Sequence, residues 1–243
     1  MAVHLGTGAL AEARLADCAE AVARRYAAEG RLVRGFVAGK LRRDPATRAV
    51  LSLAGADGFG HVLDIGCGRG QLALALLLSG HASAVTGIDR NAAHLAQAVR
   101  AAQFGAPGLD FRALQLDLSA GAALPVADTV LMIDVLYQLE PSAQDRLLHV
   151  AATAARQNLL IRTADPGRGL RSLLTRAYEV TTRRISPHGG DHVAHRPPRA
   201  IAGALRRHGF RVRILPCWQG TPFANVLLFA SRSRLPHRTA RRA

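Results

Sequence analysis

The sequence predicts an α/β fold built on a doubly wound, mostly parallel sheet. Short apolar runs alternate with longer helical patterns between about residues 61 and 162. Such alternation is typical of parallel strands joined by right-handed crossovers. A glycine-rich turn follows the first apolar run, where the chain would pass from a strand into a helix. In a sheet of this kind, ligands bind at the carboxyl ends of the strands.

The elements follow in order along the chain. We expect strands near 61–65, 83–88, 109–115, 129–135 and 158–162, and helices near 69–79, 91–103 and 141–157. Periodic apolar residues predict two further helices, at 170–185 and 198–208, the second ending at Gly209. The last two predicted strands are 210–216 and 225–231.

Residues 1–55 form a separate N-terminal region in this interpretation. Residues 9–29 carry helix-forming alanines between charges, and 31–53 form a basic amphipathic segment. The region is either a helical cap over the substrate side or a solvated helix pair that covers a sheet edge. The main domain covers 56–231 with an insertion at 166–197, and we expect the basic tail 232–243 to be disordered.

Composition limits the class of protein. The chain has 243 residues, of which 49 % are hydrophobic, enough to bury one substantial core. Three scattered cysteines form neither a disulfide framework nor a zinc pattern, which favours a reducing compartment. No secretory leader is recognisable, and the longest apolar run, 72–78, is too short to span a bilayer. We therefore expect a cytoplasmic protein.

The formal net charge of +15 is typical of proteins that bind nucleic acid. Two observations weaken that interpretation. Lys40 is the only lysine, so the excess is almost all arginine, as in chains from G+C-rich genomes. Part of the excess also lies in the tail. Nucleic acid therefore stays an alternative partner.

The segment Asp64–Gly70 has the pattern G-x-G-x-G, with an acid two residues before the first glycine. Glycines allow a sharp turn and a close approach of the backbone to a ligand. The free N–H groups of the following helix would point at the same ligand. A carboxylate here would repel a pyrophosphate but attract an ammonium or a sulfonium group.

Acids also follow three later strands. Asp89 lies about twenty residues past the loop, the offset at which a carboxylate can bind both ribose hydroxyls of a nucleoside. Asp117 and Asp134 follow the next two strands. Each has a structural alternative: Asp89 could cap a helix, and Asp117 could be a turn residue.

The pattern D-I-G-C-G-x-G at 64–70 resembles the first motif of class I methyltransferases that use S-adenosylmethionine. The resemblance implies a Rossmann-like sheet of seven strands with a C-terminal antiparallel hairpin, and S-adenosylmethionine as the cofactor. It implies that the loop wraps the methionine part, that Asp117 meets the adenine amino group, and that 128–137 faces the transferable methyl. The implied cofactor-binding residues are Asp64, Gly66, Cys67, Gly68, Gly70, Asp89, Arg90, Asp117, Leu118 and Asp134.

Methyl transfer requires a positioned nucleophile, and a base only when that nucleophile carries a proton. Our candidate catalytic residues are Tyr137 and His192, and our candidate substrate contacts are Tyr26, Tyr137 and Phe223. Histidine is the natural base near neutral pH. The histidines at 188, 192 and 195 are either loop residues without a function, a base or substrate contact, or metal ligands; we assign no metal.

Segments 25–26, 39–45 and 220–228 are similar to methyltransferases of bacterial aryl-polyene and xanthomonadin pigment clusters. This resemblance implies a phenolic acceptor, free or attached to an acyl carrier protein. That family usually has histidine where this chain has Tyr137. The alternatives are an RNA or DNA methyltransferase and a non-catalytic protein that binds the cofactor. The segment 134–137 lacks the prolines typical of nucleic-acid amino methylation, and Pro216-Cys217 lies in the wrong place for a cysteine nucleophile.

Overall fold

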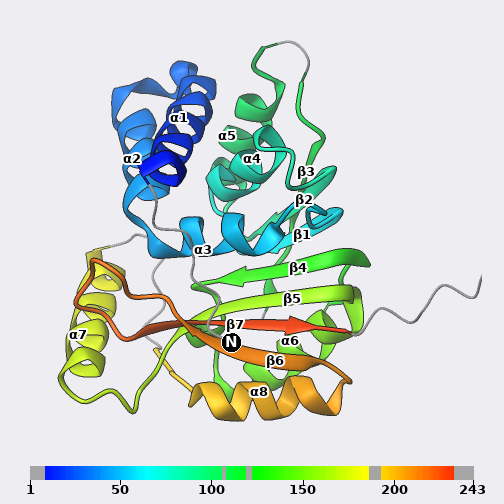
Figure 1. Cartoon of the computed structure of the whole chain (residues 1–243), viewed down its shortest axis with the longest axis vertical. Coiled ribbons are helices and arrows are strands. Elements are labelled where there is room, and N and C mark those ends of the chain that lie inside the picture. Colours follow the sequence, from blue (N-terminus) through cyan, green and yellow to red (C-terminus); the bar gives the residue numbers. More distant parts are fainter. Residues whose placement is uncertain (1–8, 106–107, 119–121, 186–192, 233–243) are drawn as a thin grey trace, which may run out of the picture.

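The protein folds around one seven-stranded sheet with helices on both faces (Figure 1). The computed structural model describes residues 9–105, 108–118, 122–185 and 193–232. His188, His192 and all but the first residue of the predicted tail lie outside the described residues. In the described part of the chain, every helix is too short or too polar to cross a membrane.

The strand order is β3-β2-β1-β4-β5-β7-β6, and β1 to β5 are parallel. Strand β7 runs antiparallel to both of its neighbours, so the last hairpin completes the sheet as predicted. The arrows for β4 and β7 point in opposite directions in Figure 1. The strands are β1 (His61–Ile65), β2 (Ala84–Asp89), β3 (Phe111–Gln115), β4 (Ala127–Ile133), β5 (Ala155–Ala164), β6 (Arg211–Pro216) and β7 (Asn225–Ser231).

The helices lie close to the predicted positions. They are α1 (Ala9–Arg25), η1 (Ala27–Glu29), α2 (Gly30–Arg43), α3 (Pro45–Ala54), α4 (Gln71–Leu78), α5 (Ala92–Gln103), η3 (Leu136–Gln138), α6 (Pro141–Ala154), α7 (Leu170–Ile185) and α8 (Pro198–Arg207).

Two predicted boundaries are wrong. The amphipathic segment 31–53 is two helices, because Asp44 accepts a hydrogen bond from the amide of Ala46 at 3.0 Å and Pro45 begins a new helix. Helix α6 ends before 157, because Ala155 already pairs with Ala127 of β4.

Alternate residues of the central strands face two separate cores. Val62 and Leu131 pack with the helices α1, α3, α4 and α5, whereas Leu63 and Met132 pack with α6 and α8. All four side chains are fully buried. Both faces of the sheet are therefore covered, which explains why the central strands are nearly continuous apolar runs.

Hydrogen bonds attach the end of α1 to the glycine loop and to α5. Tyr26, at the end of α1, is fully buried, and its hydroxyl donates to the carbonyl oxygen of Arg69. Arg25 donates to the carbonyl oxygens of Ala102 at 3.2 Å and Phe104 at 2.5 Å, at the end of α5. The candidate substrate contact Tyr26 thus supports the loop from beneath and does not line the cavity described below.

A buried guanidinium connects the N-terminal helices to the sheet. Arg162 of β5 is 6 % exposed and pairs with Asp44 at 3.0 Å and with Asp134 at 2.7 Å. Asp44 begins α3, and Asp134 follows β4. Burial lowers the pKa of Arg162, but the two carboxylates outweigh it and hold that pKa above its ordinary value. The guanidinium therefore stays positively charged.

We expect Arg162→Met to lower the free energy of unfolding by about 3–5 kcal/mol, because two carboxylates lose their cation in a buried place. Arg156→Met is the matched control on the same strand. Arg156 is 67 % exposed and lies 3.9 Å from Asp128, so its loss should cost less than about 0.5 kcal/mol. Urea unfolding of both variants measures the difference, and equal costs would contradict the anchoring function of Arg162.

Candidate functional site

A cavity of about 820 Å³ lies at the carboxyl ends of the parallel strands, where ligands bind in this fold. Helix α2 forms one wall, and α7 with the connector between β6 and β7 forms another. Several charged side chains of both signs line it: Lys40, Arg43, Asp44, Asp89, Arg90, Asp134, Arg162 and Glu179. The cavity is large enough for a nucleoside-sized ligand together with a second small molecule.

The three loop glycines have positive φ angles of 73°, 56° and 75° at Gly66, Gly68 and Gly70. A Cβ atom on Gly66 would lie 2.2 Å from Cγ2 of Val135, and one on Gly70 would lie 2.8 Å from Cβ of Ala98. A Cβ atom on Gly68 would meet nothing within 4 Å. The outer two glycines therefore permit close packing, whereas the middle glycine borders open space.

Two backbone amides fix the carboxylate of Asp89 at the end of β2. One carboxylate oxygen accepts from the amide of Gly68 at 2.8 Å, and the other accepts from the amide of Asn91 at 2.8 Å. Asn91, and not Asp89, caps α5, since its side chain accepts from the amide of His94. Asp89 also lines the cavity. Its carboxylate is thus fixed by the loop and faces the ligand space.

Asp64 lies in a smaller cavity of about 50 Å³ beside the first one. Lys40 and Asp44 line both cavities. Asp64 is only 3 % exposed, and burial together with the charge of Asp89 raises its pKa to about 7, although Lys40 opposes the rise. The side-chain oxygen of Gln71 is buried there without a partner among the described residues. Two oxygen acceptors in a confined space form a pocket for a cation.

Asp134 occupies a strained position at the end of β4. It is the one described residue other than glycine with a positive φ, 61°. Burial raises the pKa of Asp134, and Arg162 and Lys40 oppose that rise. Nε of Arg162 is buried and has no partner in the described chain, so one donor at this cavity wall stays unused. Strain and unused donors of this kind are found at functional sites.

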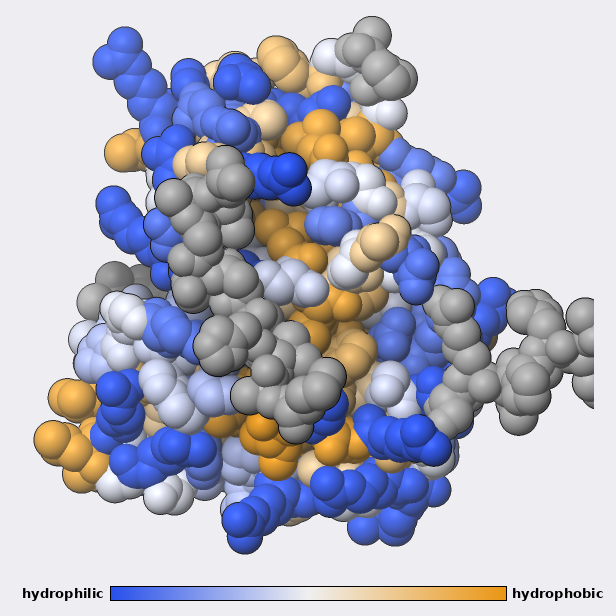
Figure 2. Space-filling view, viewed as in Figure 1, coloured by the Kyte–Doolittle hydropathy of each residue, from blue (hydrophilic) through white to orange (hydrophobic). Residues whose placement is uncertain are grey.

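The outer part of the cavity is aromatic. Phe36 of α2, Tyr178 of α7 and Phe223 of the connector line it, and the rings of Tyr178 and Phe223 lie 4.9 Å apart. Phe36 and Tyr178 are about half exposed. Hydrophilic side chains cover much of the face shown in Figure 2, and apolar side chains protrude at the edge formed by α7.

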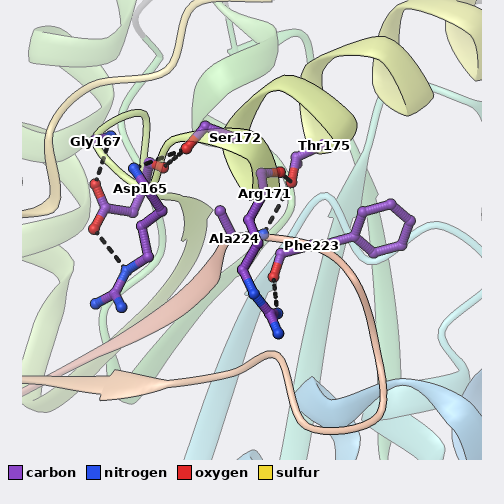
Figure 3. A network of polar contacts seen from close by, with 8 residues as sticks. Asp165, Gly167, Arg171, Ser172, Thr175, Phe223 and Ala224 are labelled. Atoms are coloured by element: carbon purple, nitrogen blue, oxygen red, sulfur yellow. Dashed lines mark hydrogen bonds and ion pairs between the residues drawn. The ribbon is translucent and has the colours of Figure 1, made fainter.

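Helix α7 is attached to the connector by a polar network (Figure 3). Arg171 donates to the carbonyl oxygens of Thr221 at 3.1 Å and Phe223 at 3.2 Å. The hydroxyl of Thr175 accepts from the amide of Ala224 at 2.9 Å. In Figure 3 both side chains reach from the helix toward the connector. The network holds Tyr178 and Phe223 in the same wall.

The structure brings together only part of the predicted set. Asp89, Arg90, Asp134, Tyr137 and Phe223 line the large cavity, and Asp64, Gly66 and Cys67 line the small one. Asp117 is exposed and Leu118 half-buried after β3, and neither lines either cavity.

Sequence reasoning missed Lys40, Gln71, Arg162, Tyr178 and Glu179 as residues that line the cavities. One signal was available for Lys40, because it is the single lysine in a chain whose other positive side chains are arginines.

The cysteines do not have the properties of nucleophiles. Burial raises the pKa of Cys67 well above its ordinary value and that of Cys217 to about 12. A thiolate is the reactive form, so neither thiol is activated. Among the described residues, no group of three or more histidines, cysteines and acids lies together as a metal site would require.

Comparison with known proteins finds one family match. Residues 62–158 match the family described as "Methyltransferase domain". A search of curated proteins gives no match. The matched segment includes the glycine loop, Asp89 and Asp134.

Solved structures of methyltransferases share the fold. The magnesium protoporphyrin IX methyltransferase of Synechocystis PCC 6803, solved with SAH bound, is 23 % identical with a TM-score of 0.59, covering 82 % of this chain and 88 % of that one. An N-methyltransferase of Bradyrhizobium japonicum WM9, also with S-adenosyl-L-homocysteine, is 18 % identical with a TM-score of 0.56, covering 81 % and 91 %. An O-methyltransferase family protein of Burkholderia thailandensis is 19 % identical with a TM-score of 0.59, covering 83 % and 60 %.

The glycine geometry predicts different costs at two positions of one loop. Gly66→Ala should lower the free energy of unfolding by about 2–4 kcal/mol, because the new methyl group overlaps Val135 and the backbone is left-handed. Gly68→Ala should lower it by only about 1 kcal/mol, because only the backbone conformation is unfavourable. Urea unfolding compares the two, and a Gly68 variant as unstable as the Gly66 variant would contradict the open space at Gly68.

The raised pKa of Asp64 predicts a pH-dependent stability. The pKa of Asp64 in the folded protein is about 7, which lies above that of a carboxyl group in the unfolded chain. The contribution of Asp64 to the free energy of unfolding of the ligand-free protein therefore decreases as pH rises from about 4 through 7. Asp64→Asn removes the loss. We expect the variant to exceed the parent by about 4 kcal/mol at pH 8 and by only about 1 kcal/mol near pH 4.5. Unfolding at both pH values measures this, and a difference that is the same at both would exclude Asp64 as its source.

Proposed function

We propose that this protein transfers the methyl group of S-adenosylmethionine to a small aromatic acceptor. The observation that carries the proposal is a pair of adjacent cavities with unlike linings, which share Lys40 and Asp44. Asp64 and Gln71 form a cation pocket in the small cavity, and Phe36, Tyr178 and Phe223 form an aromatic wall in the large one. The methyltransferase domain match and the shared fold support the same reaction class.

The residues present fit the cofactor. Gly68 leaves open the space that a side chain would fill, and the carboxylate of Asp89 faces the cavity next to it. Asp64 is a buried acid that lacks a full counter-charge, which a bound cation would supply. When bound, S-adenosylmethionine supplies a methyl group on a positively charged sulfur. We propose that Asp64 and Gln71 bind the methionine part and that Asp89 binds the ribose hydroxyls.

The chain's own residues would perform the remaining work. Asp134 and Tyr137 line the large cavity, and we propose that they face the methyl group and the acceptor. The helices α2 and α7 exclude water from the space between them. Positioning and dehydration account for much of the catalysis expected of such a displacement, because the reacting carbon is already activated.

We propose an aromatic, phenolic acceptor on the shape and chemistry of the outer cavity. Gly35 and Gly39 lie one turn apart on α2 and line the cavity, and a Cβ atom on either would meet nothing within 4 Å. Glycine inside a helix costs about 1 kcal/mol relative to alanine, and here no packing compensates for it. The bare backbone forms a flat surface opposite Tyr178 and Phe223 that suits a planar ring.

The resemblance to pigment-cluster methyltransferases supports a phenolic group at the end of a longer apolar molecule. The exposed side chains of Phe36 and Tyr178 at the cavity wall are compatible with a tail that extends outward. We further propose that an acyl carrier protein holds this acceptor. Arg43 and Arg90 also line the cavity, and their charge would favour an acidic carrier.

The proposal is tested by binding and by turnover. Calorimetry should detect S-adenosylmethionine binding, and Gly68→Val should abolish it by filling the ligand space. Methyl-labelled cofactor should then transfer label to phenols with apolar substituents, supplied free or on a carrier protein. A folded parent protein that binds NAD but not S-adenosylmethionine would refute the cofactor. Binding without transfer to any acceptor would favour a non-catalytic partner protein.

The glycines of α2 predict that one substitution weakens acceptor binding without lowering the stability of the protein. Gly39→Leu should keep or raise the thermal midpoint, since a helix former replaces glycine where no atom lies within 4 Å. It should raise the KM of a phenolic acceptor at least tenfold and leave the cofactor Kd within about twofold. Gly203→Leu on α8, remote from both cavities, is the control for a second helical glycine. An unchanged KM in Gly39→Leu would contradict the proposed acceptor surface.

A further inference from the structure

A carboxylate and an imidazole lie in contact behind the aromatic wall. Oε2 of Glu179 and Nε2 of His195 are 2.5 Å apart. The two side chains are only 12 % and 9 % exposed. Nδ1 of His195 is buried and lacks a partner among the described residues. A mostly buried imidazole that pairs with an acid through one nitrogen and leaves the other nitrogen unused is a candidate functional group.

Three elements converge on this pair. Glu179 lies on α7 and lines the large cavity, whereas His195 lies in the segment before α8. The ring of Tyr137, on η3, lies 4.8 Å from the ring of His195. The carbonyl oxygen of Tyr137 accepts from the amide of Ala194 at 2.9 Å, so the backbone next to His195 is fixed to η3.

A second contact fixes the same segment. Nε2 of Gln144, a fully buried residue on α6, donates to the carbonyl oxygens of Ala194 at 2.8 Å and Leu139 at 2.9 Å. The segment that carries His195 is therefore attached to η3 directly through Tyr137 and, through Gln144, to α6 and Leu139. This rigid attachment is what a proton-transfer group needs, since its distance to the acceptor must be maintained.

We propose that Glu179 and His195 form the proton-accepting pair for the acceptor hydroxyl, with Glu179 facing the cavity and His195 behind it. The inference rests on the proposed function and deepens it. Glu179 would be a catalytic residue and His195 a positioning residue that stabilises the transferred proton.

The proton and electron balance of the step is complete. The O–H bond of the acceptor breaks, and its proton passes to Glu179 and is shared with His195. The acceptor oxygen forms a bond to the methyl carbon as the carbon–sulfur bond breaks, and that electron pair stays on the sulfur. The pair then returns its proton to solvent. No oxidant, reductant or further reactant is required.

The surrounding charges are mixed. Asp134 lies close enough for Glu179 to raise its pKa, and Lys40 and Arg162 lower that same pKa. Lys40, Asp134 and Arg162 line the same cavity as Glu179, from α2, β4 and β5, and the ring of Tyr137 on η3 lies against that of His195. The cations at this wall favour the phenolate over the neutral phenol, and so they assist proton removal.

The test uses the full chain with Glu179→Gln and His195→Gln, and with His149→Gln as the control. His149 lies on α6 beside His208 and away from the cavity. Acceptors should range from an unactivated phenol to 4-nitrophenol, which ionises near neutral pH. Both active-site variants should lose about 10²–10³-fold in kcat with the unactivated phenol and much less with 4-nitrophenol. The cofactor Kd should stay within about twofold, and His149→Gln should match the parent.

An optical measurement without cofactor tests the pair independently of turnover. Bound 4-nitrophenol should show the visible absorption of its phenolate in the parent protein at a pH where free 4-nitrophenol is neutral, and this absorption should disappear in Glu179→Gln. An equal loss of kcat across all phenols, with no optical change, would show that the pair is merely structural and would overturn the inference.

The remaining outcomes separate the two proposals. If the parent protein and both variants methylate phenols equally well, Glu179 and His195 are not the proton acceptor, but the proposed function stands. A parent protein that binds cofactor yet methylates no phenol would refute the phenolic acceptor and, with it, the base assigned to that acceptor.

Discussion

One buried guanidinium determines the shape of the site. Arg162 joins Asp44, where α3 begins, to Asp134, where β4 ends, and it lies on β5 between them in the fold. Helix α2 runs directly into Asp44, so the cavity-lining face of α2 is positioned by the same contact. Asp134 has a left-handed backbone that costs free energy for any residue with a Cβ atom. The ion pair with Arg162 compensates for that cost and keeps the carboxylate at the cavity.

The negative charge of Asp64 is only partly compensated by nearby positive charge. Asp64 has a pKa of about 7 because burial and Asp89 disfavour its ionised form, and Lys40 compensates only in part. Without a ligand, the protein has a lower free energy of unfolding with Asp64 than it would have with a neutral side chain at this position. A bound cation would restore that free energy. Conflicts of this kind between stability and binding are common in enzymes. The single lysine of the chain, Lys40, lines both cavities.

The two walls of the cavity are built from different parts of the chain and in different ways. The wall that we assign to the cofactor consists of strand ends and the glycine loop, which are hydrogen-bonded to the sheet. The wall that we assign to the acceptor consists of α2, α7 and the connector before β7, which depend on side-chain contacts such as Arg171 to Phe223 and Thr175 to Ala224. A fold that hosts many reactions can thus keep one wall constant and change the other. Specificity for the acceptor is expected in the second wall.

The sequence by itself determined the order of the elements and the position of the glycine loop. Short apolar runs, helical periods and the spacing of glycines are local properties, so the strands and the loop at 66–70 could be predicted, as could the placement of Asp64, Asp89 and Asp134 at the carboxyl ends of strands. Only the tertiary structure decided the partners of Arg162, the burial of Tyr26 beneath the loop, and the meeting of Glu179 with His195. The reason is physical: Arg162 and Asp44 are 118 positions apart, and Glu179 and His195 lie on separate elements beyond the sheet. No local pattern encodes a contact whose geometry depends on how whole helices pack against the sheet.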